Sequence, residues 1–249
     1  VYMEVRNRNI REINFKKKLV LGTMKLKNYF STSKELAKFL IYAHQKGINQ
    51  LHVSSEYNSY PLLLKSLKLI KKNFKFIVKL AEPADINKKF DLRSFKSKLK
   101  KYSNDLGKKN IHTLQWVDRY KLNHPKKYFI YKEEILNKIE NTIEQYKKEK
   151  KIKFFYFFPY HKTKDLLGMH PYINGITCYR NINNYKYDSF AKKYKFKIIA
   201  IRTLGGYKKF TKKINIKKLI MFNLKNKLIS KIIVGANNRN QLDKILEIL

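Results

Sequence analysis

Short apolar runs recur along the chain, and each has the length of a buried β-strand. Most are continuous rather than alternating, which is typical of strands covered on both faces, as in parallel sheets. The runs predict strands at Leu19–Met24, Gln50–Ser54, Phe74–Leu80, Ile111–Val117, Lys153–Phe158, Gly175–Tyr179, Phe196–Ile201 and Lys231–Val234. The aromatic run at 154–158 is one of them, and we interpret it as core rather than as a platform for stacked bases.

The segments between these strands carry apolar residues at three- and four-residue spacing, the pattern of helices with one buried face. We expect helices at Ser33–Gln45, Pro61–Leu69, Leu92–Leu106 and Glu133–Lys147, shorter ones around Lys164, Ser189 and Ile216, and a last one at Asn240–Leu249. Thr32 and Glu35 have the spacing of a capping box, in which each side chain accepts a hydrogen bond from the backbone N–H of the other residue. The first helix is therefore expected to begin directly after Thr32.

Strands that alternate with helices over 249 residues predict an α/β fold, a single-domain (β/α)8 or TIM barrel that covers residues 1–249. The alternative is an open, doubly wound sheet, which usually has fewer strands and a glycine-rich first turn. Here the first turn reads Gly22-Thr23-Met24-Lys25, without that glycine pattern. In a barrel the chemistry lies where strands end and loops begin. His52 and Tyr57 follow the second strand candidate and Lys79 lies near the end of the third, so all three are candidate site residues.

The composition limits where the chain works. With 43% hydrophobic residues the chain can bury a normal core, and it has no run of about 18 uncharged apolar residues that would span a membrane. Cys178 is the single cysteine, so no internal disulfide can form, and a cytoplasmic location is expected. No basic-then-apolar signal is seen at the N-terminus. The start at Val1, without an initiator methionine, is typical of a fragment.

The charge is far from balanced, with 57 Lys and Arg residues against 18 Asp and Glu and a formal net charge of +39. A field of this size attracts nucleic acid or anionic membranes. The basic residues are, however, scattered along the whole chain, and Lys, Asn, Ile, Tyr and Phe are abundant together, as expected from an AT-rich coding sequence. We interpret the charge as compositional drift and expect no specific nucleic-acid partner. A functional basic surface is the alternative.

Five segments, in chain order, resemble motifs of one enzyme family, the aldo-keto reductases. They are the first strand Leu19–Met24, the motif from Gly47-Ile48-Asn49 to Tyr57, the lysine strand Phe76–Lys79, the seventh strand Ile198–Ile201 with Leu204–Gly206, and the last strand Ile232–Ala236 with Gln241-Leu242. Each match is weak singly, but together they cover nearly the whole chain. The resemblance implies a (β/α)8 barrel and the NADPH-dependent reduction of a carbonyl group.

The resemblance also implies a catalytic group: a tyrosine that donates a proton, assisted by a lysine, an aspartate and a histidine. Tyr57 and Lys79 stand at the tyrosine and lysine positions, His52 stands at the aspartate position, and Val117 stands at the histidine position. A phenol, with a pKa of about 10, is a poor acid at neutral pH, and a nearby ammonium favours its charged form. We therefore expect Tyr57, Lys79 and His52 to be the catalytic residues.

The cofactor that the resemblance implies is NADP(H). The residues expected to contact it are Gly22, Thr23, Arg202, Gly235, Asn237 and Gln241. Arg202 ends a strand, where arginine can bind phosphate through two parallel hydrogen bonds, or it is a surface cation. Other positions depart from the family pattern: Phe158-Pro159 replaces Ser-Asn, Thr177 stands at a glutamine position, and Ile245 replaces an asparagine that meets the adenine.

Two further sets of residues are weaker candidates. His161 and His170 flank charged residues at no familiar metal spacing, so we expect no metal site. Tyr207–Lys213 is a basic segment and a candidate anion-binding loop.

The leading hypothesis is a divergent, NADP(H)-dependent reductase of a small carbonyl or sugar-derived substrate, with low activity. The alternative is a catalytically silent barrel that binds an anionic ligand. A third hypothesis, a protein associated with nucleic acid, depends on the charge alone.

Overall fold

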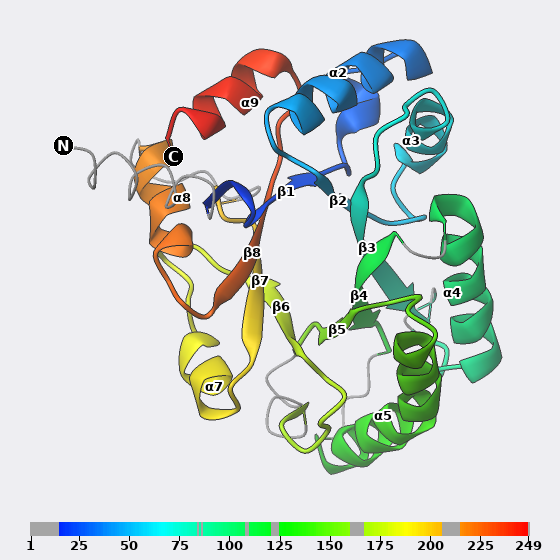
Figure 1. Cartoon of the computed structure of the whole chain (residues 1–249). Helices are drawn as coiled ribbons and strands as arrows, with labels where there is room; N and C mark the ends of the chain where they lie inside the picture. The colour runs from blue at the N-terminus through cyan, green and yellow to red at the C-terminus, as the bar shows by residue number, and fades with distance from the viewer. Residues whose placement is uncertain are drawn as a thin grey trace. The chain divides into compact units, whose positions relative to one another are not determined.

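The eight strands found in the described residues form a closed parallel barrel in the order β1 to β8, which confirms the predicted (β/α)8 fold (Figure 1). The computed structural model describes residues 15–83, 85, 87–107, 110–120, 125–159, 167–205 and 215–248. The strands are β1 (Leu19–Gly22), β2 (Gln50–Val53), β3 (Lys75–Glu82), β4 (Ile111–Asp118), β5 (Phe154–Phe157), β6 (Gly175–Tyr179), β7 (Lys197–Ile201) and β8 (Ile229–Val234). Each strand begins and ends within two residues of its predicted bounds.

Helices follow most of these strands, as predicted. They are α2 (Ser33–Gln45), α3 (Tyr60–Leu67), α4 (Leu92–Leu106), α5 (Pro125–Lys148), α7 (Asp188–Lys193), α8 (Ile216–Leu224) and α9 (Arg239–Leu246), with a short 3₁₀ helix η1 (Leu26–Asn28). The helix expected around Lys164 lies outside the described residues. In the described part of the chain, no helix is both long and apolar enough to cross a bilayer.

The helix α5 begins at Pro125, well before the predicted start at Glu133. Proline suits the first turn of a helix because the N–H that it lacks would have no intrahelical acceptor there. Phe129 and Ile130 in the added part are exposed. They do not belong to the buried face whose spacing predicted the helix, so the pattern missed its first two turns.

The chain divides into two compact units, which are described separately. The first unit comprises residues 1–74, 179–186 and 198–249, and the second comprises residues 75–178 and 187–197. The expectation of one domain over the whole chain stays a prediction.

In the first unit, β1 pairs with β2 on one side and with β8 on the other, and β8 pairs with β7. Outside these strands α2 and α9 lie side by side (Figure 1), and the Tyr42 hydroxyl donates to the Asp243 carboxylate at 2.7 Å. The predicted capping box forms: Thr32 Oγ1 accepts from the Glu35 N–H, and the Glu35 carboxylate accepts from the Thr32 N–H. These local bonds explain why α2 begins where the sequence predicted.

In the second unit, β3 pairs with β4, β4 with β5 and β5 with β6, with Lys79 opposite Gln115. Trp116 is fully buried, and its ring packs against those of Phe95, at 6.1 Å between centroids, and Phe157, at 5.2 Å. Phe155–Phe157 are buried too, which confirms that the aromatic run is core. Large rings between strand and helix thus fill the outer layer of this unit.

Candidate active site

The candidate site begins where β2 ends. All four residues of β2 are buried, and the chain turns at Ser54. The Tyr57 N–H donates to the Ser54 carbonyl oxygen at 3.1 Å, and the Tyr60 N–H donates to the Tyr57 carbonyl oxygen at 2.8 Å. These bonds curl the chain into the start of α3 and hold Tyr57 next to the end of the strand that carries His52.

Two buried hydroxyl groups join this turn to the end of β1. Thr23 Oγ1 donates to the His52 carbonyl oxygen at 2.8 Å, and the Thr23 N–H donates to the same oxygen at 3.2 Å. Ser59 Oγ donates to the Thr23 carbonyl oxygen at 2.7 Å. Both hydroxyls are buried, so these bonds replace contacts with water that folding removes. Thr23, expected at the cofactor, therefore directs its hydroxyl at the backbone of His52.

His52 and Tyr57 contact each other through their side chains. The Tyr57 hydroxyl oxygen lies 3.5 Å from His52 Nδ1, and the ring centroids are 6.0 Å apart. His52 is buried, whereas Tyr57 is partly exposed. The distance is at the long end for a hydrogen bond. An imidazole here can accept the phenol proton or donate one to the phenolate, depending on which ring nitrogen carries hydrogen.

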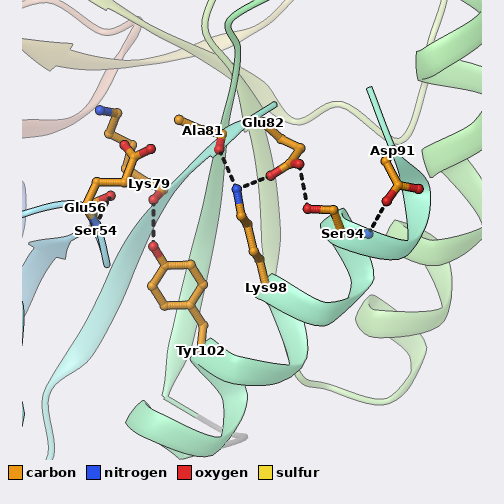
Figure 2. A network of polar contacts seen from close by, with 9 residues as sticks. All are labelled: Ser54, Glu56, Lys79, Ala81, Glu82, Asp91, Ser94, Lys98 and Tyr102. Atoms are coloured by element: carbon orange, nitrogen blue, oxygen red, sulfur yellow. Dashed lines mark hydrogen bonds and ion pairs between the residues drawn. The ribbon is translucent and has the colours of Figure 1, made fainter. Parts of the chain in front are cut away.

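Lys79, the third expected catalytic residue, lies on β3 in the second unit. Glu82 of the same strand contacts α4, and side chains alternate between the two faces of a strand. Lys79 therefore points away from α4, as Figure 2 shows. Its carbonyl oxygen accepts a hydrogen bond from the Tyr102 hydroxyl at 3.1 Å. That the Lys79 ammonium lies beside Tyr57 stays a prediction.

Two residues expected at the cofactor, Gly22 and Arg202, have distinct surroundings in the first unit. A Cβ on Gly22 would lie 3.2 Å from Cγ2 of Ile233, so the close approach of β1 and β8 explains this glycine. Arg202 is exposed, and its guanidinium carbon stacks 4.0 Å from the ring centroid of Tyr179. A stacked guanidinium directs its N–H groups outward along its own plane, a geometry that suits phosphate.

Gly235, Asn237 and Gln241, also expected at the cofactor, lie around the start of α9. The Asn237 N–H donates to Gln241 Oε1 at 2.9 Å, and the Gln241 N–H donates to Asn238 Oδ1 at 2.9 Å. The second bond satisfies an N–H that a helix start leaves without an intrahelical acceptor. A Cβ on Gly235 would meet no described atom within 4 Å. Asn237 and Gln241 thus order the start of the helix, and their contact with a cofactor stays a prediction.

The end of β5 does not fit the amide group of a nicotinamide. The Phe158 N–H donates to the Trp116 carbonyl oxygen at 3.0 Å, and the Pro159 carbonyl oxygen accepts from the Tyr187 hydroxyl at 2.8 Å. Proline has no N–H, and neither side chain carries a hydrogen-bonding group. Val117, at the histidine position of the motif, is buried and has no proton to transfer. At these positions an amide group would meet apolar side chains but no side chain that can form a hydrogen bond with it.

Two buried carboxylates at strand ends were missed by the sequence analysis. Glu82 ends β3, where its carboxylate contacts the Lys98 ammonium. Asp118 ends β4 and contacts the Lys132 ammonium, with both side chains at most 1% exposed. Burial lowers the pKa of Lys132 to about 7, and the contact with Asp118 opposes that shift. The signal for both pairs was an acid directly after an apolar run, followed by a lysine on the next helix.

No metal-binding cluster of three or more His, Cys, Asp or Glu side chains occurs among the described residues. His170 is buried beside Tyr172, with 5.6 Å between ring centroids, and burial lowers its pKa. His161 and the basic segment Tyr207–Lys213 lie outside the described residues.

Comparison with known proteins adds the fold relationship. No protein-family profile matches the chain, and a search of curated protein sequences found no match. Solved structures do match. An aldo-keto reductase from Bacillus halodurans in its holo form has a TM-score of 0.68 at 12% identity, covering 93% of this chain and 86% of that one. The glycerol dehydrogenase of Gluconobacter oxydans has a TM-score of 0.67 at 12% identity, covering 93% and 86%.

A third similar structure carries a cofactor. It is an aldo-keto reductase from Klebsiella pneumoniae in complex with NADPH, with a TM-score of 0.69 at 9% identity, covering 93% of this chain and 84% of that one. At such identities the likeness is one of fold. The chain therefore has the fold of the aldo-keto reductases.

Proposed function

We propose that this chain is a divergent oxidoreductase that reduces a small carbonyl or sugar-derived substrate at a low rate. The observation that carries the proposal is the contact between the Tyr57 hydroxyl and His52 Nδ1 at 3.5 Å. When a carbonyl is reduced, its oxygen gains negative charge and takes up a proton. Tyr57 is partly exposed at the end of a barrel strand, so its hydroxyl can reach such an oxygen.

His52 assists Tyr57 in this proposal. Proton donation leaves a phenolate, and a donor or positive charge beside it stabilises that charged form. The buried His52 ring is in position to donate to the phenolate or to return the proton. We propose that the Lys79 ammonium adds to this stabilisation. Because the turn at Ser54 and the Thr23 bonds fix both backbones, the phenol and the imidazole keep their relative positions.

NADP(H) is the proposed cofactor, and when bound it would supply the hydride. The proposal takes support from the Klebsiella aldo-keto reductase, which was solved with NADPH. Phe158 and Pro159 do not fit the amide of the nicotinamide ring, so we propose weak binding with low turnover.

The test is a fluorescence titration with NADPH and NADP⁺, followed by assays on a panel of aldehydes and sugar ketones. Tyr57→Phe removes only the hydroxyl, and we expect it to lower turnover by about 10²–10⁴-fold, as for the loss of a general acid. Tyr29→Phe is the matched control, since Tyr29 is exposed elsewhere in the first unit. Equal trace activity in wild type and Tyr57→Phe would remove Tyr57 as the acid. That outcome, with binding of an anionic ligand, would favour the silent barrel.

A further inference from the structure

One face of α4 makes polar contacts with successive positions of β3. Ser94, Lys98 and Tyr102 are four residues apart, so they share a face of the helix. Figure 2 shows their side chains in a row along that face. The helix advances about 12 Å over these eight residues, and β3 advances about 10 Å from Lys79 to Glu82. The three helix side chains can therefore reach the strand at points between Lys79 and Glu82.

Two of the contacts are made at the C-terminal end of β3. The Ser94 hydroxyl donates to Glu82 Oε1 at 2.7 Å. The Lys98 ammonium contacts the other Glu82 oxygen and donates to the Ala81 carbonyl oxygen at 3.3 Å. Asp91 caps the helix by accepting from the Ser94 N–H at 3.1 Å, which fixes the helix start relative to this contact. Glu82 is only 3% exposed, so these partners replace the water that its carboxylate loses on folding.

The third contact is made at Lys79, whose ammonium is proposed to assist Tyr57. Tyr102 is 2% exposed, and its hydroxyl donates to the Lys79 carbonyl oxygen at 3.1 Å. A carbonyl oxygen has two lone pairs, so it can accept this bond in addition to a bond of the sheet. A shift of that carbonyl rotates the peptide next to the Lys79 Cα, and the side chain moves with it.

We propose that Ser94, Lys98 and Tyr102 are positioning residues for Lys79. Their contacts fix the position of the C-terminal half of β3 along α4 and its rotation about the strand axis. They thereby set the direction in which the Lys79 side chain leaves the strand. The catalytic consequence rests on the proposed function, but the geometric claim does not. Deleting a member of the row should alter the surroundings of side chain 79 even in a protein that remains folded.

The geometric claim is tested with a thiol at position 79. Lys79→Cys is made in a Cys178→Ala background, because Cys178 is the single native cysteine. The rate of alkylation by iodoacetamide is measured against pH. Adding Tyr102→Phe removes one hydroxyl and should change the rate several-fold. Adding Ser103→Ala is the matched control: Ser103 is the next residue of α4, and its buried hydroxyl has no hydrogen-bond partner among the described residues. That change should leave the rate as it was.

A purely structural role for Tyr102 would lower the melting temperature of the Tyr102→Phe protein and leave the alkylation profile unchanged. That result overturns the proposal. If Tyr102→Phe does not fold, Lys98→Met and Lys98→Arg give a second pair. Methionine loses both contacts of the ammonium, so the rate should change, whereas arginine keeps a cation and donors and should restore it. Identical rates for these two variants and their parent would also overturn the proposal.

Activity separates this inference from the proposed function. With Lys79 in place, Tyr102→Phe should lower kcat by up to about 100-fold and leave KM unchanged, because a misplaced group acts mainly on the reacting step. Suppose that neither wild type nor any variant reduces a carbonyl, but the alkylation rate still depends on Tyr102. The positioning role of Tyr102 then stands, and the proposed function fails. The opposite result is also possible: wild type is active, but Tyr102→Phe changes neither its kcat nor the alkylation rate of the Lys79→Cys protein. In that case the proposed function stands and the positioning role is wrong.

Discussion

The strands β2 and β4 both end in a buried segment with polar side chains, but these polar groups differ in what they contact. Nearly every residue of the two strands is buried, and polar residues follow each strand. At the end of β4, Asp118 contacts Lys132, and both side chains are at most 1% exposed. At the end of β2, the Tyr57 hydroxyl oxygen lies 3.5 Å from His52 Nδ1, and Tyr57 is partly exposed.

The difference separates a polar cluster that stabilises the fold from one that, in the proposed function, transfers a proton. A buried ion pair has given up its water, so each partner depends on the other and neither can turn to a substrate without a large cost. A phenol and an imidazole do not need charge to be stable, and they can exchange a proton without unfolding anything around them. In this protein a shifted pKa, as at Lys132, is therefore a weaker indication of a candidate site than a partly exposed group beside a proton donor or acceptor.

A second phenol makes the same contrast. Tyr131 of α5 accepts a hydrogen bond from the Phe90 N–H at 2.7 Å, and its ring lies 4.7 Å from that of Tyr120. Burial raises the pKa of Tyr131 to about 12, although the hydrogen bond from Phe90 opposes the shift. This phenol is further from acid chemistry than an ordinary tyrosine. Its hydroxyl serves as an acceptor that holds the segment before α4.

The largest effect on stability is expected from breaking the ion pair at the end of β4. Lys132→Met leaves the Asp118 carboxylate buried without its cation, which typically costs about 3–5 kcal/mol. The free energy of unfolding in urea measures this loss at a pH below the pKa of Lys132, where its ammonium is charged. The double variant Asp118→Asn, Lys132→Met removes both charges and should recover most of the stability. A cost below about 1 kcal/mol for the single variant would place the pair with ordinary surface ion pairs, and the contrast with β2 would lapse.

The same pair predicts a dependence on pH. Burial lowers the pKa of Lys132 from its ordinary value of 10.5 to about 7. Between these values the unfolded chain holds a proton that the folded chain lacks, so stability rises with pH across this window, and the penalty is complete below it. Unfolding free energies of wild type and the double variant, compared at several pH values from 7 upward, isolate this slope. Equal slopes in both proteins would show that the Asp118 contact cancels the effect of burial.

Local sequence signals were enough to predict much of the fold. The bounds of α2 and α4 match the predicted ranges, because each helix begins after a side chain that caps its own first turn, Thr32 and Asp91. The contact between His52 and Tyr57 also follows from local sequence, since the two residues are five apart and one turn joins them. That they form a catalytic site stays a prediction.

The ion-pair partners that are distant in sequence could not be predicted. The predicted third and fourth strands ended at Leu80 and Val117, short of the acid that ends each strand. Glu82 and Asp118 instead remain within β3 and β4, where lysines of the following helices neutralise them. Only packing brings these partners together, and local sequence patterns do not reveal it.

A smaller loss of stability is expected from Tyr131→Phe. The change deletes the acceptor of the partly buried Phe90 N–H, and the loss of such a hydrogen bond costs about 0.5–1.5 kcal/mol. Urea unfolding measures the difference. Tyr120→Phe is the control, since it keeps the neighbouring ring and should cost no more than about 0.5 kcal/mol. Equal values for the two variants would argue that the Tyr131 hydroxyl does not hold the segment before α4.

The smallest effect on stability is expected at the proposed acid itself. Tyr57→Phe keeps the ring against His52 and deletes a hydroxyl whose contact, at 3.5 Å, is long. The group is partly exposed, so water can take its place at His52 Nδ1, and the free energy of unfolding should change by no more than about 0.5 kcal/mol. Turnover should nevertheless fall, as argued above, so one hydroxyl would affect chemistry far more than folding. That combination is the opposite of the expectation for Lys132, where folding carries the whole effect. A Tyr57→Phe protein that loses 2 kcal/mol or more, roughly the cost of an unsatisfied buried group, would place Tyr57 with the structural residues. The ends of β2 and β4 would then differ in charge but not in role.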